Sequence, residues 1–218
     1  MSKGTIVFDL DGTLVDSAPD INVIADAVLA TQGAAPLTLA QTRDFIGNGA
    51  GVFVSRMMRA RDISDTPALH ASLLKDFETR YRTATQHSVL YPDVVAVLTT
   101  LKDAGFKLGL CTNKPMAPTQ AVLEHFEIGR FFDAVSGGDS QPQTKPDAAP
   151  LLNVFAQLGD GTRLYVGDSE VDAETAQNAA VPFALFTEGY RKTPVSELPH
   201  TYVFSSFADL PGIVASHS

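Results

Sequence analysis

Short apolar runs alternate with helical segments along most of this chain, and this alternation constrains the fold more than any other feature of the sequence. The apolar runs that predict strands lie at residues 107–111, 134–136, 164–166 and 183–186. Segments with helical periodicity separate them, and strands joined by helices of this length pair in parallel. We therefore predict an α/β fold, with a Rossmann-like parallel sheet that carries helices on both faces.

A further strand stands apart from this set, at the start of the chain. Residues 5–8 form a short apolar run that ends in Asp-Leu-Asp-Gly, as expected for a buried strand that enters a tight loop. The segment that follows shows helical periodicity and no convincing strand. We therefore predict a discontinuous α/β core, residues 1–16 and 87–218, and an inserted all-helical cap domain, residues 17–86. We expect the chain after Pro211 to fray.

Charge and cysteine content narrow the range of partners. The chain has 25 acidic and 16 basic residues, a formal net charge of -9. Such a surface repels phosphate backbones, so we expect no nucleic-acid partner. Cys111 lies in an apolar run and is interpreted as a small core residue. We find no secretory signal and no apolar stretch of transmembrane length, so we expect a cytoplasmic protein without a membrane partner. The expected oligomeric state, which no pattern in the sequence indicates, is a monomer or a homodimer.

Polar residues follow the predicted strands, at the carboxyl ends where parallel sheets place their functional groups. Another polar residue precedes a predicted helix start. These candidates are Asp9 and Asp11 after the first strand, Thr112 and Asn113 after the next core strand, Lys145 before a helix, and Asp168 with Asp172 one helical turn beyond it. Because such ends meet at one edge of a parallel sheet, we expect these side chains to form a single site.

The residue types in this set suit phosphoryl transfer. The carboxylates of Asp9, Asp11 and Asp168 would repel one another unless a cation lay among them. Mg²⁺ prefers oxygen ligands and sites that it shares with phosphate, and Lys145 adds a second positive charge. Asp9 and Asp11 face the same way in an extended chain, so one can attack phosphorus while the other transfers a proton. We therefore predict a magnesium-dependent site for a small phosphate ester.

Each motif also has an ordinary structural explanation when it is taken alone. Asp-x-Asp-Gly occurs in turns, Thr-Asn caps helices, and an isolated lysine is usually solvated. A calcium loop that begins at Asp9 does not fit, because its sixth position is Leu14 and its twelfth is Asp20. The occurrence of several such sets at strand and helix junctions of one chain favours a common site.

A glycine-rich segment, Gly-Asn-Gly-Ala-Gly-Val, occupies residues 47–52. It differs from a dinucleotide-binding loop because position 52 is Val and no strand precedes it. We interpret it as a turn between two helices of the cap. A purely structural turn and a turn whose amides contact the substrate, through Gly47, Asn48 and Gly49, both remain open.

Taken together, these motifs resemble the haloacid dehalogenase (HAD) superfamily of phosphatases, and the resemblance spans nearly the whole chain. The matching segments, in the order typical of the family, are residues 8–14, 111–115, 145–147 and 167–172. Further segments resemble the phosphoglycolate phosphatase branch and lie at residues 16–20, 46–50, 137–139 and 189–190. The resemblance implies a HAD-like core and a cap that closes over the substrate.

The resemblance also implies a role for each candidate residue. Asp9 would be the nucleophile and a Mg²⁺ ligand, and Asp11 the general acid and base, with its backbone carbonyl on the metal. Thr112 and Asn113 would hold the phosphoryl group, Lys145 would neutralise it, Asp168 would bind Mg²⁺, and Asp172 would support the metal or Lys145. The sequence departs from the family at Ala148, where proline is frequent, and at Ala180, where glycine is usual; we expect both to affect loop stiffness only.

The favoured hypothesis is a phosphatase that converts 2-phosphoglycolate to glycolate and phosphate through a phospho-aspartyl intermediate on Asp9. One alternative is a phosphomutase of the β-phosphoglucomutase type, which Thr13 disfavours because it resembles the phosphatase form of the loop. Another is a HAD phosphatase that acts on a sugar phosphate or on pyrophosphate. A non-catalytic binding protein is disfavoured because the reacting residues are intact.

Overall fold

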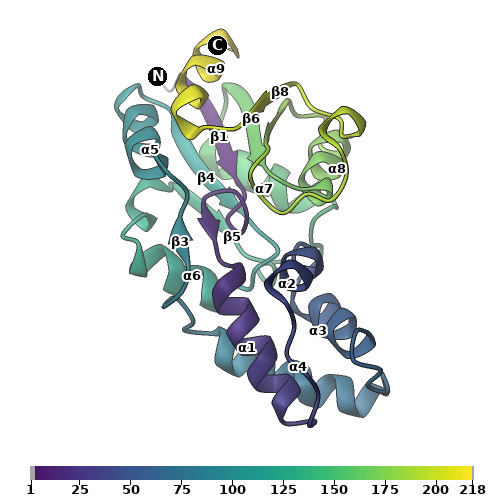
Figure 1. Ribbon diagram of the computed structural model, residues 1–218. Helices are drawn as coiled ribbons and strands as arrows, with labels where there is room; N and C mark the ends of the chain where they lie inside the picture. The colour runs from purple at the N-terminus through teal and green to yellow at the C-terminus, as the bar shows by residue number, and fades with distance from the viewer. Residues whose placement is uncertain (1–2, 218) are drawn as a thin grey trace.

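A six-stranded parallel sheet forms the centre of the protein, as the computed structural model of residues 3–217 shows (Figure 1). Every neighbouring pair in this sheet is parallel. In spatial order the strands are β5 (Ala134–Ser136), β4 (Lys107–Cys111), β1 (Gly4–Phe8), β6 (Thr162–Gly167), β7 (Phe183–Phe186) and β8 (Tyr202–Phe204). The predicted α/β class is confirmed. Strand β1 pairs with strands that lie more than a hundred residues away in sequence.

Helices cover both faces of the sheet because successive residues of a strand point to opposite faces. Ile6 and Phe8 of β1 pack on one side, with α5 (Val94–Asp103), α6 (Met116–His125) and α9 (Leu210–His217). Val7 packs on the other side, with α7 (Ala149–Leu158) and α8 (Glu170–Asn178). Short 3₁₀ helices lie in the connections, at Gly129–Phe131, Val195–Glu197 and Phe207–Asp209. Two apolar layers therefore hold the sheet between them.

A helical lobe is inserted between two very short strands, β2 (Val15–Asp16) and β3 (Val89–Leu90), which pair with each other in antiparallel orientation. Its helices are α1 (Ala18–Ala30), α2 (Leu39–Phe45), α3 (Ala50–Arg59) and α4 (Pro67–Tyr81). The lobe has an apolar core of its own, distinct from the two layers on the sheet. No helix within residues 3–217 has the length and apolar character needed to cross a membrane.

A buried carboxylate joins the two ends of this lobe. Asp20, near the start of α1, accepts hydrogen bonds from the backbone N–H groups of His87 and Ser88, where the chain returns to the core. A buried carboxylate that accepts such bonds is well stabilised. The entry and exit of the lobe are therefore held side by side.

The register of the central strands places the candidate residues next to one another. Phe8, the last residue of β1, pairs with Leu110 of β4 and with Val166 of β6. The chain segments that follow these three strands therefore emerge together at one edge of the sheet, and the helical lobe lies beyond this edge (Figure 1).

Two expectations from the sequence receive a clear outcome elsewhere in the core. Residues 212–217 belong to helix α9, which buries Leu210 and Val214 against the sheet, so this part of the chain does not fray; Ser218 lies outside the described residues. This corrects the prediction for the end of the chain. Cys111 is fully buried in β4, as expected, and burial raises the pKa of its thiol to about 12.

Ala180 occupies a backbone conformation that favours glycine. Its φ is 52°, in the left-handed region, at the turn that follows α8. A side chain in this region costs about 1–2 kcal/mol. The departure from the usual glycine at this position therefore introduces local strain, beyond the change in loop stiffness that the sequence suggested.

Ala180→Gly should stabilise the protein by roughly 0.5–1 kcal/mol, because relief of the strain exceeds the added entropy of the unfolded chain. Ala179→Gly is the matched control: Ala179 is in the right-handed helical region, with φ -84°, and gains no relief. That variant should be destabilised by up to about 1 kcal/mol. Urea denaturation measures both changes, and equal destabilisation of the two variants would contradict the assignment of strain to Ala180.

Candidate functional site

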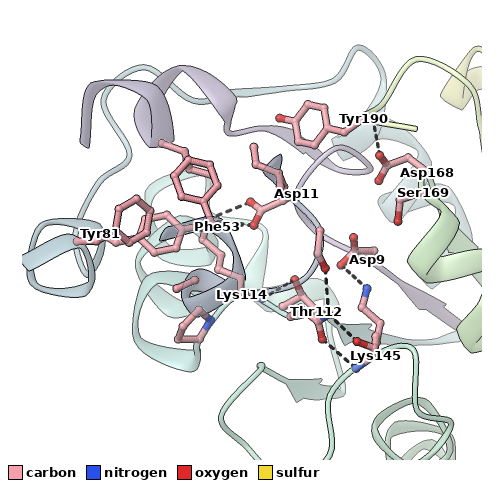
Figure 2. Close-up of a pocket in the computed structure, with 18 residues that line it drawn as sticks. Asp9, Asp11, Phe53, Tyr81, Thr112, Lys114, Lys145, Asp168, Ser169 and Tyr190 are labelled. Carbon is pink, nitrogen blue, oxygen red and sulfur yellow. Dashed lines mark hydrogen bonds and ion pairs between the residues drawn. The ribbon is translucent and has the colours of Figure 1, made fainter. Parts of the chain in front are cut away.

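A pocket lies between the carboxyl edge of the sheet and the helical lobe (Figure 2). The residues on its core side are mostly polar, and include Asp9, Asp11, Thr112, Lys145 and Asp168. The residues on its lobe side are mostly apolar, and include Ile21, Ile46, Phe53 and Phe77. The candidates predicted at separate strand ends therefore meet in one place, against an apolar wall that the lobe supplies.

Lys145 is the buried cation at the centre of the polar side. Its Nζ lies 2.9 Å from Asp9 Oδ1 and 2.7 Å from Asp172 Oδ1, and it donates to the hydroxyl of Tyr165. Asn113 fixes its backbone, because the side-chain amide accepts from Lys145 N and donates to Lys145 O. Although burial alone lowers it, the charges of Asp172 and Asp9 raise the pKa of Lys145 above its usual value. Lys145 is therefore a fixed positive charge.

Asp172 holds Lys145 in position. Its Oδ1 accepts from Lys145 and Tyr165, and its Oδ2 accepts from the N–H groups of Asp168 and Ser169 and from the Ser169 hydroxyl. Burial alone would raise its pKa, but Lys145 and these donors keep the pKa of Asp172 below its usual value. With both oxygens engaged, Asp172 fits the support of Lys145 better than direct metal ligation.

Asp9, Asp168 and Asp172 form a buried acidic cluster, each with a carboxylate oxygen within 4.8 Å of the others. Asp9 Oδ1 accepts no hydrogen bond within residues 3–217, despite its ion-pair contact with Lys145. Burial raises the pKa of Asp9 to about 7, although Lys145 acts in the opposite direction. Burial, together with the charges of Asp172 and Asp9, raises the pKa of Asp168 well above its usual range. Such a set fits a hard cation, which would stabilise the charged carboxylates.

The surroundings of Asp168 leave no room for larger neighbours. Its carboxylate accepts from the Thr13 hydroxyl at 2.7 Å and from Tyr190 N at 2.6 Å. A Cβ added at Gly12 or at Gly189 would collide with this carboxylate. Gly12 also has a φ of 88°, so the tight turn after Asp11 needs glycine for its backbone as well.

The carboxylate of Asp11 points away from this cluster and toward the lobe. It accepts hydrogen bonds from Ser17 Oγ at 2.6 Å, from Lys114 Nζ at 3.0 Å and from Tyr81 OH at 3.4 Å. The expectation that the carboxylates of Asp9, Asp11 and Asp168 converge on one point is therefore met only by Asp9 and Asp168. The backbone carbonyl of Asp11 remains the group that could face a cation.

Thr112 and Asn113 have different environments, although they are adjacent in sequence. Thr112 lines the pocket, and its hydroxyl accepts from Lys114 N. Asn113 uses its side chain to join Lys145 to the lobe, where it donates to Gly47 O at 3.0 Å. The backbone N–H of Asn113 has no acceptor within residues 3–217. This N–H group, and not the Asn113 side chain, is therefore available to donate to an anion in the pocket.

The glycine-rich turn lies between α2 and α3, as expected. Gly47 and Gly49 line the pocket, whereas the Asn48 side chain accepts from Arg56 at 2.8 Å. Arg56 also donates to Phe45 O, so its two hydrogen bonds fix the conformation of this turn. Of the three residues predicted here, the two glycines are placed to contact a ligand.

Lys114 is a pocket residue that sequence reasoning did not assign. Its side chain is 1% exposed and pairs with Asp11. The available signal was its place within the motif at residues 111–115, directly after Thr112 and Asn113.

Comparisons with known proteins show which chains this one resembles as a whole. Residues 6–186 match the family model described as haloacid dehalogenase-like hydrolase. The chain is 48% identical, over 96% of both chains, to the phosphoglycolate phosphatase of Cereibacter sphaeroides (strain ATCC 17029 / ATH 2.4.9). It is 42% identical to that of Rhodobacter capsulatus, over 96% of this chain and 95% of the relative. A crystal structure of a predicted phosphoglycolate phosphatase from Haemophilus somnus 129pt superposes with a TM-score of 0.90, at 31% identity and 98% coverage of both chains.

Lys145→Met should destabilise the fold by about 3–5 kcal/mol, because it leaves the buried charges of Asp9 and Asp172 without their cation. The matched control is Lys102→Met, which breaks an ion pair with Asp133 in which the side chains are 30% and 40% exposed. That change should cost no more than about 1 kcal/mol. Urea denaturation at pH 7 gives both values.

A double variant, Lys145→Met with Asp172→Asn, shows whether Lys145→Met loses stability because buried charge is uncompensated or because packing is lost. It should recover part of the stability that Lys145→Met loses, because one of the uncompensated charges is gone. Equal losses in the Lys145→Met and Lys102→Met proteins would show that Lys145 does not compensate buried charge.

Proposed function

This chain belongs to the haloacid dehalogenase-like hydrolase family, and we propose that it is a phosphatase that converts 2-phosphoglycolate to glycolate and phosphate. One observation carries this proposal. The buried carboxylate of Asp9 lies at the end of β1 between a fixed cation, Lys145, and a second buried carboxylate, Asp168. A nucleophile placed between positive charge and a cation-binding carboxylate suits attack on a phosphate ester.

Asp9 is the nucleophile in this proposal. One of its carboxylate oxygens attacks phosphorus, and the bond from phosphorus to the ester oxygen breaks, which leaves a phosphoryl group on Asp9. Lys145 Nζ, 2.9 Å from Asp9, offsets the negative charge of the phosphoryl oxygens. The Thr112 hydroxyl and the backbone N–H groups of Leu10, Asp11 and Asn113 can donate to those oxygens. None of these three N–H groups has an acceptor elsewhere in the described chain.

Asp11 transfers the protons. It gives a proton to the ester oxygen as glycolate leaves, then takes one from the water that attacks the phosphoryl group. The bond between phosphorus and Asp9 breaks, phosphate leaves, and Asp9 and Asp11 return to their starting states. The contacts with Ser17 and Tyr81 fix the Asp11 carboxylate at the boundary between core and lobe, beside the leaving group.

We propose Mg²⁺ as the cation of this site. The carboxylates of Asp9 and Asp168 and the backbone carbonyl of Asp11 would hold it, and Asp172 would act indirectly by orienting Lys145. When bound, the ion supplies positive charge that neutralises the phosphoryl oxygens. The buried acidic cluster that Asp9 and Asp168 form, together with the burial that raises the pKa of both carboxyl groups, supports this assignment.

The helical lobe, residues 17–86, is proposed to be a cap on a core made of residues 1–16 and 87–218. Polar contacts cross the pocket between the two parts: Lys114 to Tyr81, and Asn113 to Gly47. The apolar lobe wall above the polar residues excludes water from the reacting atoms when the contacts are made. Opening of the lobe would then admit the substrate and release the products.

Asp9→Asn should lower kcat for 2-phosphoglycolate by about 10⁴-fold or more, because an amide is a very weak nucleophile. Phosphate release measures turnover, and an acid quench of enzyme with labelled substrate detects the phosphoryl-enzyme in the unchanged protein only. The control is Asp76→Asn, which alters an exposed ion pair of the lobe and should keep normal turnover. Near-normal turnover by Asp9→Asn would rule out the covalent mechanism.

Removal of divalent metal with EDTA should abolish phosphate release, and added Mg²⁺ should restore it. Asp168→Asn should raise the Mg²⁺ concentration for half-maximal activity by at least about 10-fold, because a charged ligand is lost. Mg²⁺ should also raise the melting temperature of the unchanged protein, and much less that of Asp168→Asn. Full activity in EDTA would remove magnesium from the proposal.

A further inference from the structure

Lys114 is a buried cation to which the reaction above gives no role. It lies three residues after the end of β4, and its side chain is 1% exposed. Its Nζ lies 3.0 Å from Asp11 Oδ1, 2.7 Å from Tyr81 OH and 4.3 Å from the centre of the Tyr81 ring. Figure 2 shows Lys114 on the lobe side of Asp11, away from Asp9 and Lys145. The pocket therefore has a second positive charge, at the end opposite to Lys145.

Lys114 is the cation best placed for a ligand group at the lobe end. Among the described residues that line the pocket, the positively charged ones are Lys114 and Lys145. Arg43, on α2, pairs with Asp16, and Arg56 is engaged behind the glycine-rich turn. Neither arginine lines the pocket. A negative group at this end would otherwise meet an apolar wall, where an uncompensated charge is very unfavourable.

The ammonium of Lys114 also has donor capacity for a ligand. An ammonium carries three N–H donors. Within the described residues its partners are a single carboxylate, that of Asp11, and a single hydroxyl, that of Tyr81. When each takes one donor, a third remains for an acceptor in the pocket.

The proposed substrate carries an acceptor at the corresponding place. In 2-phosphoglycolate one methylene group separates the carboxylate from the ester oxygen. The proposed reaction brings that oxygen to Asp11, so the carboxylate lies near any cation that contacts Asp11. A hydrogen bond between this carboxylate and an ammonium group is charge-assisted, and such bonds are among the stronger polar contacts.

We propose that Lys114, positioned by the hydroxyl of Tyr81, binds the carboxylate of the substrate and so selects carboxylate-bearing phosphate esters. This inference rests on the proposed phosphatase function, and it identifies Lys114 as the residue that binds the leaving group. Because Tyr81 belongs to the lobe, the contact that positions Lys114 exists only when lobe and core are together. Selection therefore takes place in the closed pocket.

The alternative is that Lys114 only orients Asp11. A matched pair of substrates separates the two roles: 2-phosphoglycolate and the phosphate ester of glycolamide, in which a neutral amide replaces the carboxylate. The quantity to measure is the ratio of kcat/KM for the first ester to that for the second. A residue that only orients Asp11 affects both esters equally and leaves this ratio unchanged.

In the unchanged protein we expect a ratio of about 10 to 100, the range for a hydrogen bond to a charged group. Lys114→Met should bring the ratio to within about threefold of unity and should weaken inhibition by glycolate but not by inorganic phosphate. Tyr81→Phe keeps the ring and removes the hydroxyl, and should lower the ratio by several fold. Lys107→Met, at the other end of β4, should leave the ratio unchanged.

The outcomes distinguish this inference from the proposed function. A high ratio that survives in both Lys114→Met and Tyr81→Phe would overturn the role of Lys114 and leave the phosphatase in place. Failure of the unchanged protein to hydrolyse 2-phosphoglycolate, with turnover of other esters, would overturn both. If Lys114→Met does not fold, Lys114→Gln and Tyr81→Phe provide the same comparison.

Discussion

The site depends on the compensation of negative charge that the fold buries. Asp9, Asp168 and Asp172 lie within 4.8 Å of one another and away from water, which is unfavourable unless positive charge lies among them. Lys145 supplies part of that charge and pairs with Asp9 and Asp172. Burial raises the pKa of Asp9 and of Asp168, as expected where a single lysine faces three carboxylates. This excess of buried negative charge is the physical basis of the magnesium site proposed above.

The pocket contains two buried cations, although the protein as a whole is acidic. Lys145 pairs with Asp9 on the core side, and Lys114 pairs with Asp11 toward the lobe. A small dianionic head and a carboxylate tail would each meet a cation, and the apolar lobe wall strengthens both contacts by excluding water. With a net charge of -9, the protein does not attract an anion through its overall field, so the proposed binding of substrate depends on these two buried lysines.

The α/β core could be predicted from the sequence because its strands and helices are long enough for their apolar periodicity to be visible. The strands β2, β3 and β8 were not predicted, because they are very short, lie in no clear apolar run and form only where a partner strand lies beside them. Strand β5 is equally short but was predicted, because it falls within the alternation of strands and helices. The last helix, α9, was missed for a related reason: its stability comes from Leu210 and Val214 packing on the sheet, which no local pattern reveals. The backbone strain at Ala180 was not predicted either, because it arises from the turn after α8, which the surrounding fold imposes.

The sequence by itself determined which reactive groups the protein has and which strand ends carry them. Because parallel strands run in the same direction, their carboxyl ends lie at one edge of the sheet. Only the tertiary structure decided what each side chain does there. In the folded protein the Asp11 carboxylate faces Lys114 and the lobe, and the Asn113 side chain bonds both Lys145 and the glycine-rich turn. Asp172 accepts a hydrogen bond from Lys145. Such pairings depend on side-chain direction and join residues as far as 103 positions apart, and neither property is encoded in the spacing of residues along the chain.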